Sequence, residues 1–83
     1  MIINVRHQQN RLTLDFRLRQ IRYLAEGQPI QFRDMSHTTS DAFECLFKED
    51  ASQFLDALAE EAEDLFEVPF KTKDLSIESG SKP

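Results

Sequence analysis

Five carboxylates between residues 56 and 67 have the type and spacing to bind a cationic partner. They recur at positions i, i+4, i+7, i+8 and i+11, with no lysine or arginine among them: Asp56, Glu60, Glu63, Asp64 and Glu67. On a helix these positions form one stripe, here called the acidic ridge, with Glu61 at its margin. Each like-charge pair three or four residues apart costs about 0.2–0.5 kcal/mol, so the ridge opposes local folding.

Three interpretations of the acidic ridge are compatible with the sequence. The first is a solvated face, because acids promote solubility and salt screens their repulsion beyond about 8–10 Å. The second is pairing with arginines of the same chain or of a second copy in a homodimer. The third is docking on another protein with a basic surface. As a function we favour the third, in an inhibitor, adaptor or modulator of the kind that phages and mobile elements also encode.

Arginine is the second group that could recognise a ligand, since its planar guanidinium suits phosphates and carboxylates. Residues 1–33 carry six arginines against two acids, a net charge of +4, whereas residues 34–67 carry eleven acids against Lys48, a net charge of −10. Strand alternation predicts that five arginines face away from the core: Arg6, Arg11, Arg17, Arg19 and Arg33. This arginine set supports an alternative function, nucleic-acid binding. The net charge of −5 and the lack of a clear outward aromatic side chain weigh against it.

The sequence contains no recognisable catalytic or metal-binding pattern. Cys45 is the only cysteine, and between Phe43 and Phe47 it is expected to pack as a small apolar side chain. His7 and His37 stand apart, where we expect solvent exposure, and neither belongs to a cluster with zinc-ligand spacing. No glycine-rich phosphate loop or nucleophile motif occurs. We therefore expect no enzyme activity, no catalytic residue, no metal and no cofactor.

Size and composition indicate one small domain. At this length a chain buries only about 60–65% of its unfolded surface, so a homodimer is one way to supplement the core. A single cysteine is typical of a reducing compartment, and the first ten residues lack the apolar run of a signal peptide. No stretch approaches the roughly 20 apolar residues that span a bilayer. We expect a cytoplasmic protein that does not bind membranes.

The acidic ridge requires a helix, and the sequence predicts one from Ala51 to Phe66. Apolar residues recur there with the helical period: Ala51, Phe54, Leu55, Leu58, Ala62, Leu65 and Phe66. Asp50 is the predicted N-cap, and Pro69 prevents extension soon after the ridge. Residues 43–48 alternate in polarity, and we favour a strand there because an N-cap is of little use in mid-helix. A backward extension of the helix, capped at Asp41, is the alternative.

The pattern of residues in the first third of the chain predicts the strands that would carry the arginine set. Residues 2–6 are rich in β-branched side chains, and residues 11–19 alternate strictly, with Leu12, Leu14, Phe16 and Leu18 inward. The alternation slips at Gln20, where a bend would turn Ile21 and Tyr23 inward, although a helix over residues 15–25 competes. A further strand follows Pro29, with Ile30 and Phe32 expected inward.

Strands followed by a helix predict an α+β domain. We expect a small antiparallel sheet of four or five strands, with one C-terminal amphipathic helix packed on one face. Residues 1–68 would form this domain and residues 69–83 a short flexible tail, in which residues 74–78 are a candidate strand.

Overall fold

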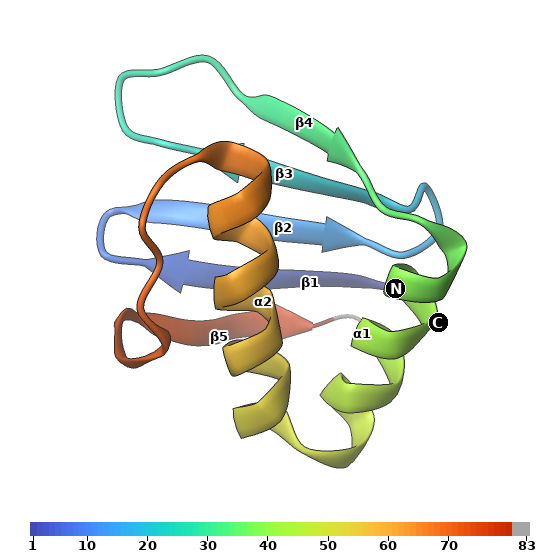
Figure 1. Ribbon diagram of the computed structural model, residues 1–83. Helices are drawn as coiled ribbons and strands as arrows, with labels where there is room; N and C mark the ends of the chain where they lie inside the picture. Colours follow the sequence, from blue (N-terminus) through green and yellow to red (C-terminus); the bar gives the residue numbers. More distant parts are fainter. Residues whose placement is uncertain (81–83) are drawn as a thin grey trace.

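The computed structural model describes residues 1–80 and is built on a five-stranded antiparallel sheet (Figure 1). Its strands are β1 (Ile2–His7), β2 (Asn10–Asp15), β3 (Gln20–Leu24), β4 (Gln31–Asp34) and β5 (Leu75–Gly80). They lie in the order β4-β3-β2-β1-β5, so the first four form a meander and β5 returns to pair with β1. The predicted α+β class and antiparallel sheet are confirmed.

Two helices, α1 (His37–Glu49) and α2 (Ala51–Phe66), cover one face of the sheet (Figure 1). The sequence predicted only α2 at these bounds. The predicted single helix is therefore wrong, and so is the strand over residues 43–48, which lies within α1. Phe43 and Phe47, one turn apart, both place their rings against Phe54 of α2, at centroid distances of 5.9 and 5.3 Å.

Asp50 explains why the two helices are separate. Its backbone is extended, which ends α1, and its carboxylate accepts hydrogen bonds from the backbone N–H groups of Ser52 and Gln53. These bonds satisfy two of the donors left free at the start of α2. The predicted N-cap is thus confirmed, but the element that precedes it is another helix.

The core lies between the sheet and the helices. The strands contribute side chains that are almost fully buried: Ile3, Val5, Leu12, Leu14, Ile21 and Tyr23. The α2 helix contributes most of its predicted apolar stripe, together with Ala59: Phe54, Leu58, Ala62 and Phe66. Leu55 and Leu65 are half-buried at its edges, and Ala51 is exposed. Because α2 packs this stripe on the sheet, its acidic stripe must face away from it.

The β2 strand ends earlier than its alternation predicts. The Asp15 carboxylate accepts hydrogen bonds from the backbone N–H groups of Arg17 and Leu18, both at 3.1 Å, which turns the chain. Arg19 then takes a left-handed conformation with φ of 53°. Leu18, predicted inward, is 61% exposed. Residues 16–19 therefore form a turn, and β3 follows with Ile21 and Tyr23 inward, as predicted, instead of the competing helix.

The β4 strand presents the opposite faces from those predicted. The register pairs Arg33 with Ile21 and Phe32 with Arg22, and directly opposite residues share a face. Arg33 therefore faces the helices, whereas Phe32 is 51% exposed on the other side. Ile30, also predicted inward, is exposed just before the strand. A shift of one residue in the alternation exchanges the two faces, which is why these predictions were wrong.

Residues 69–80 belong to the folded domain, not to a tail. The Phe70 ring is buried, 4.7 Å from the ring of His7 and 5.3 Å from that of Tyr23. His7 is consequently buried, contrary to the predicted exposure. After the short 3-10 helix η1 (Thr72–Asp74), β5 pairs with β1. The candidate strand at residues 74–78 is thus confirmed, although it begins at Leu75 and extends to Gly80. The flexible end predicted for residues 81–83 lies outside the described residues.

Candidate functional site

The acidic ridge lies on the exposed surface of α2, on the side away from the sheet. All five of its carboxylates are exposed, as the helical spacing predicted. At a rise of about 1.5 Å per residue, the ridge is about 16 Å long. Among residues 1–80, no ridge side chain takes part in an ion pair. The charge of the ridge is therefore not neutralised by the part of the chain that the structure describes.

The rest of the helical layer adds to this negative charge. Residues 37–67 contain ten acids and a single lysine, a net charge of −9. On α1, Lys48 lies 3.3 Å from the Glu44 carboxylate and His37 lies 3.5 Å from that of Asp41. Both pairs are exposed and span one helical turn, so each contributes little to stability. The helical layer is thus a strongly acidic surface as a whole.

The C-terminal end of α2 is the part of the ridge under the most strain. The last turn and the C-cap residue together hold three acids and no basic residue, although a helix C-terminus disfavours negative charge. Glu67, the C-cap residue, has a left-handed backbone with φ of 56°, a conformation that favours glycine. Arg33 is the cation that contacts this end. Its Nε donates to the Leu65 carbonyl oxygen at 3.1 Å, and its guanidinium lies 5.2 Å from the Phe66 ring centroid.

A groove of about 340 Å³ lies between the two helices, beside the ridge. The helices are joined at Asp50, which caps both of them, and they diverge from that junction (Figure 1). The α1 side of the groove is lined by Thr38, Thr39, Ala42, Phe43 and Leu46. The α2 side is lined by Ala57, Glu60, Glu61 and Asp64. Its floor is apolar, and all its acids stand on the α2 side. Two ridge residues, Glu60 and Asp64, therefore also form the rim of a hollow.

The predicted arginine set does not form one surface. Arg6 and Arg11 lie opposite each other on the sheet face that the helices leave open, as predicted. Arg17 and Arg19 lie in the turn between β2 and β3, and Arg33 lies on the helix side. The set was predicted from an alternation that continues to residue 19, but β2 ends at residue 15.

Arg22 is a member of the open face that the sequence prediction omitted. Its guanidinium donates to the Asp15 carboxylate at 3.1 Å and to the Gln20 side-chain oxygen at 2.9 Å. The predicted inward positions of Ile21 and Tyr23 already placed Arg22 outward, so the signal was present. Phe32, its cross-strand neighbour, is the outward aromatic side chain that the sequence analysis did not find.

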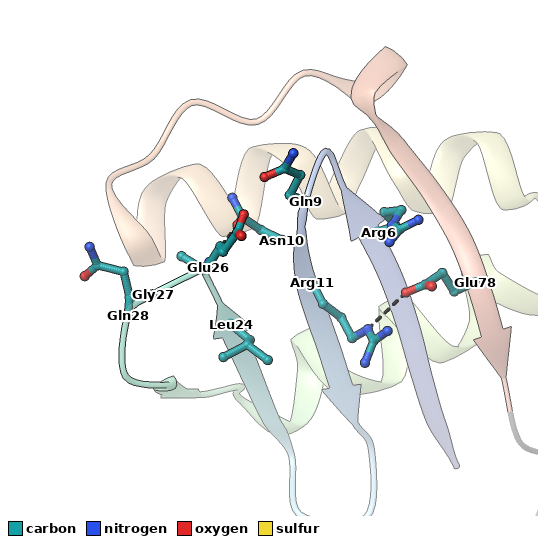
Figure 2. Close-up of a pocket in the computed structure, with 10 residues that line it drawn as sticks. Arg6, Gln9, Asn10, Arg11, Leu24, Glu26, Gly27, Gln28 and Glu78 are labelled. Atoms are coloured by element: carbon teal, nitrogen blue, oxygen red, sulfur yellow. Dashed lines mark hydrogen bonds and ion pairs between the residues drawn. The ribbon is translucent and has the colours of Figure 1, made fainter.

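The open face carries no net charge. Register and contacts place three arginines and three acids on it: Arg6, Arg11, Arg22, Asp15, Asp34 and Glu78. In Figure 2 the Arg11 side chain points across β1 toward Glu78, and its Nε lies 3.0 Å from the carboxylate. Affinity for a phosphate backbone depends on uncompensated positive charge. This face therefore offers little electrostatic attraction for nucleic acid.

A hollow of about 580 Å³ at one end of the open face contains Arg6 and Arg11 (Figure 2). Their like charges face each other across the strand pair, which is unfavourable unless an acid intervenes. Glu78 and Glu26 also line the hollow and balance the two arginines. Asn10, at the edge of the hollow, already uses its side-chain amide within the fold. It donates a hydrogen bond to the Tyr23 hydroxyl and accepts one from the Glu26 backbone N–H. We therefore assign no anion site here.

The cysteine and the two histidines lie apart from one another in the fold. Cys45 is exposed on the outer side of α1, so its predicted packing in the core is wrong. His7 packs on Phe70 in the core, and His37 is exposed. Residues 1–80 contain no group of three or more histidine, cysteine or acidic side chains that could hold a metal ion. No described helix is long and apolar enough to cross a membrane.

Comparisons with known proteins give no assignment. No protein-family model, curated protein or solved structure matches the chain. A function must therefore be argued from the charge, burial and contacts of the described residues.

Proposed function

We propose that this protein is a small, acidic, non-catalytic interaction module that acts as an inhibitor, adaptor or modulator of another protein. Its binding surface is the acidic ridge, and its partner presents a basic surface. One observation supports this most directly: five exposed carboxylates lie along about 16 Å of one helix, and none has an ion pair within residues 1–80.

The energetics of the ridge favour a basic partner. Counting Glu61 with the ridge, six like-charge pairs three or four residues apart cost about 1–3 kcal/mol together, and a bound cationic surface would offset that repulsion. Complementary charge also speeds association, since it steers the two proteins together before contact. Binding through this surface should therefore weaken as salt is added.

Two further parts of the proposal rest on the sequence. The absence of enzyme activity is supported by the lack of a nucleophile or metal motif in the sequence. It is also supported by the burial of His7 in the core, whereas the Cys45 thiol is exposed. A cytoplasmic location is supported by the single cysteine, whose thiol is exposed.

Capture experiments with matched variants test the proposal. Reversal of Glu60, Glu63 and Asp64 to lysine should abolish capture of the partner from extract of the native cell, while circular dichroism shows the variant folded. The control reverses three acids outside the ridge, Asp41, Glu44 and Glu49, and should retain most of the capture. If the ridge variant captures the same proteins as the wild type, the ridge is only a solvated face.

Nucleic-acid binding by the arginines is the second candidate. It is supported by Phe32, an exposed aromatic side chain opposite Arg22 on which a base could stack, and by Arg17 and Arg19, which have no ion pair within residues 1–80. The balanced charge of the open face opposes it. Binding of single-stranded oligonucleotides that falls on Phe32→Ala and on Arg17→Ala with Arg19→Ala would favour this candidate over the first.

A further inference from the structure

We propose that the protein self-associates by inserting Leu18 of one copy into the groove between α1 and α2 of a second copy. The inference goes beyond the proposed function, but it shares Glu60 and Asp64 with the acidic ridge. Self-association would therefore compete with the partner for part of the ridge.

Leu18 has the properties of an anchor side chain. It is 61% exposed, the largest exposure among the large apolar residues of the described chain. Arg17 and Arg19 flank it, and neither forms an ion pair within residues 1–80. An exposed apolar side chain between two unpaired cations is complementary to an apolar site with an acidic rim.

The turn that carries Leu18 is held firmly in place. The Asp15 carboxylate accepts from the backbone N–H groups of Arg17 and Leu18, and the Arg19 carbonyl accepts from the Met35 backbone N–H at 2.8 Å. An anchor on a fixed turn loses little conformational freedom on binding, which favours association.

The groove is large enough for this turn's leucine and has the opposite charge. Its volume of about 340 Å³ lies near the lower end of the range of about 300–1,000 Å³ for ligand sites, enough for one or two large side chains. Ala42 is exposed and Leu46 and Ala57 are half-buried, so apolar surface remains accessible.

The rim supplies the charges that the two arginines need. Glu60 and Asp64 lie one turn apart, and Glu61 between them is half-buried without an ion pair in residues 1–80. A partly desolvated carboxylate gains more from an arginine than an exposed one does, through charge-assisted hydrogen bonds.

The positions of turn and groove allow the contact to be made twice. The β2–β3 turn lies beside the start of α1, where Thr38 and Thr39 line the groove (Figure 1). Two copies related by a two-fold axis can then exchange both contacts, as a closed dimer requires. The interface is small, and interfaces below about 1,200 Å² are weak, so we expect a dimer that dissociates on dilution.

Sedimentation across a concentration series tests this inference, because the wild-type chain should shift from monomer to dimer. Leu18→Ser changes an exposed side chain and should weaken the dimer about tenfold or more, as expected for loss of one buried leucine per contact. Ala42→Trp, which fills the groove, should do the same, whereas Cys45→Trp on the outer side of α1 should not.

Charge-reversal variants provide the decisive test of self-association. Arg17→Glu with Arg19→Glu should abolish self-association, and so should Glu60→Lys with Asp64→Lys. A mixture of these two variants should dimerise, because each turn then meets a rim of opposite charge. Asp56→Lys with Glu63→Lys makes the same charge change outside the groove and should leave the dimer in place.

Three results would overturn the inference: a monomer at every concentration, a dimer that tolerates Leu18→Ser, or a mixture that fails to associate. None of these results contradicts the proposed function. That function fails only if reversal of the ridge charges to lysine leaves capture of the partner unchanged.

Discussion

The acidic ridge and the arginines carry opposite charge, and the fold uses them in opposite ways. Three of the six arginines are bound within the chain: Arg11 to Glu78, Arg22 to Asp15, and Arg33 to the Leu65 carbonyl. No ridge carboxylate has such a partner among residues 1–80. Half of the arginines thus serve the fold, whereas the ridge carboxylates make no ion pair with the described residues.

The elements that carry these groups explain the difference. On one face of an antiparallel sheet, directly opposite residues lie about 4.5–5.5 Å apart, so a long side chain reaches acids on nearby strands. Arg22 reaches Asp15 on the neighbouring strand, and Arg11 reaches Glu78 two strands away. On α2 the neighbours of a ridge residue are other ridge residues one turn away, all of the same sign. A charge on the open face can be compensated by a nearby strand, whereas a charge on the ridge has no opposite charge on its own helix and is left to solvent and salt unless a partner binds.

The largest expected effect separates a structural carboxylate from a ridge carboxylate. Asp15→Ala removes the acceptor for the Arg17 and Leu18 N–H groups and leaves Arg22 unpaired, so it should lower the free energy of unfolding by about 2–3 kcal/mol. Asp56→Ala, the ridge control, should instead leave it unchanged or raise it slightly, because alanine favours the helix and one like-charge pair is lost. Urea denaturation measures both. Equal losses would mean that the ridge is also structural.

The same division applies to the arginines. Arg33→Ala removes a hydrogen bond to the Leu65 carbonyl and the contact with the Phe66 ring, at a cost of about 1–2 kcal/mol. Arg17→Ala removes no ion pair and no side-chain hydrogen bond among residues 1–80, so it should cost less than about 0.5 kcal/mol. Thermal unfolding of the two variants provides the comparison. A large loss for Arg17→Ala would place that side chain among the structural arginines.

The sequence predicted the ridge better than the arginine set, and the reason is physical. On α2 the apolar and acidic stripes agree with one helical period over sixteen residues, and a single N-cap fixes the start. In the strands a shift of one residue in the alternation exchanges the inward and outward positions. Such a shift can be recognised only from the residues that follow it in the sequence. Arg33 and Phe32 were assigned to the wrong faces for this reason.

The groove escaped prediction because one helix was missed. Residues 43–48 alternate in polarity as a strand would, but Phe43 and Phe47 also keep the helical spacing. Asp50 was correctly predicted as an N-cap, and the inference that no helix precedes a cap was the error. Ser36, which caps α1 by accepting from the Thr39 N–H, was the signal that could have shown the helix.

Strain at the end of the ridge gives the third prediction. Glu67 has a left-handed backbone, so Glu67→Gly should stabilise the fold by about 1 kcal/mol, because glycine adopts this conformation without steric cost. Glu63→Gly removes the same charge but lies within the helix, where glycine costs about 1 kcal/mol. Opposite shifts in melting temperature would show that backbone strain, and not charge, limits stability there. Shifts in the same direction would contradict this.

The smallest expected effect bears directly on why the ridge persists. Glu60 has like-charge neighbours at residues 56, 63 and 64, so Glu60→Gln should stabilise the isolated protein by about 0.5–1 kcal/mol at low salt. In about 1 M salt the Debye length falls to about 3 Å and the gain should largely disappear. A chain that is more stable without this carboxylate keeps it at a cost to its own fold. If Glu60→Gln is neutral at low salt, the repulsion is already compensated and the ridge needs no partner to explain it.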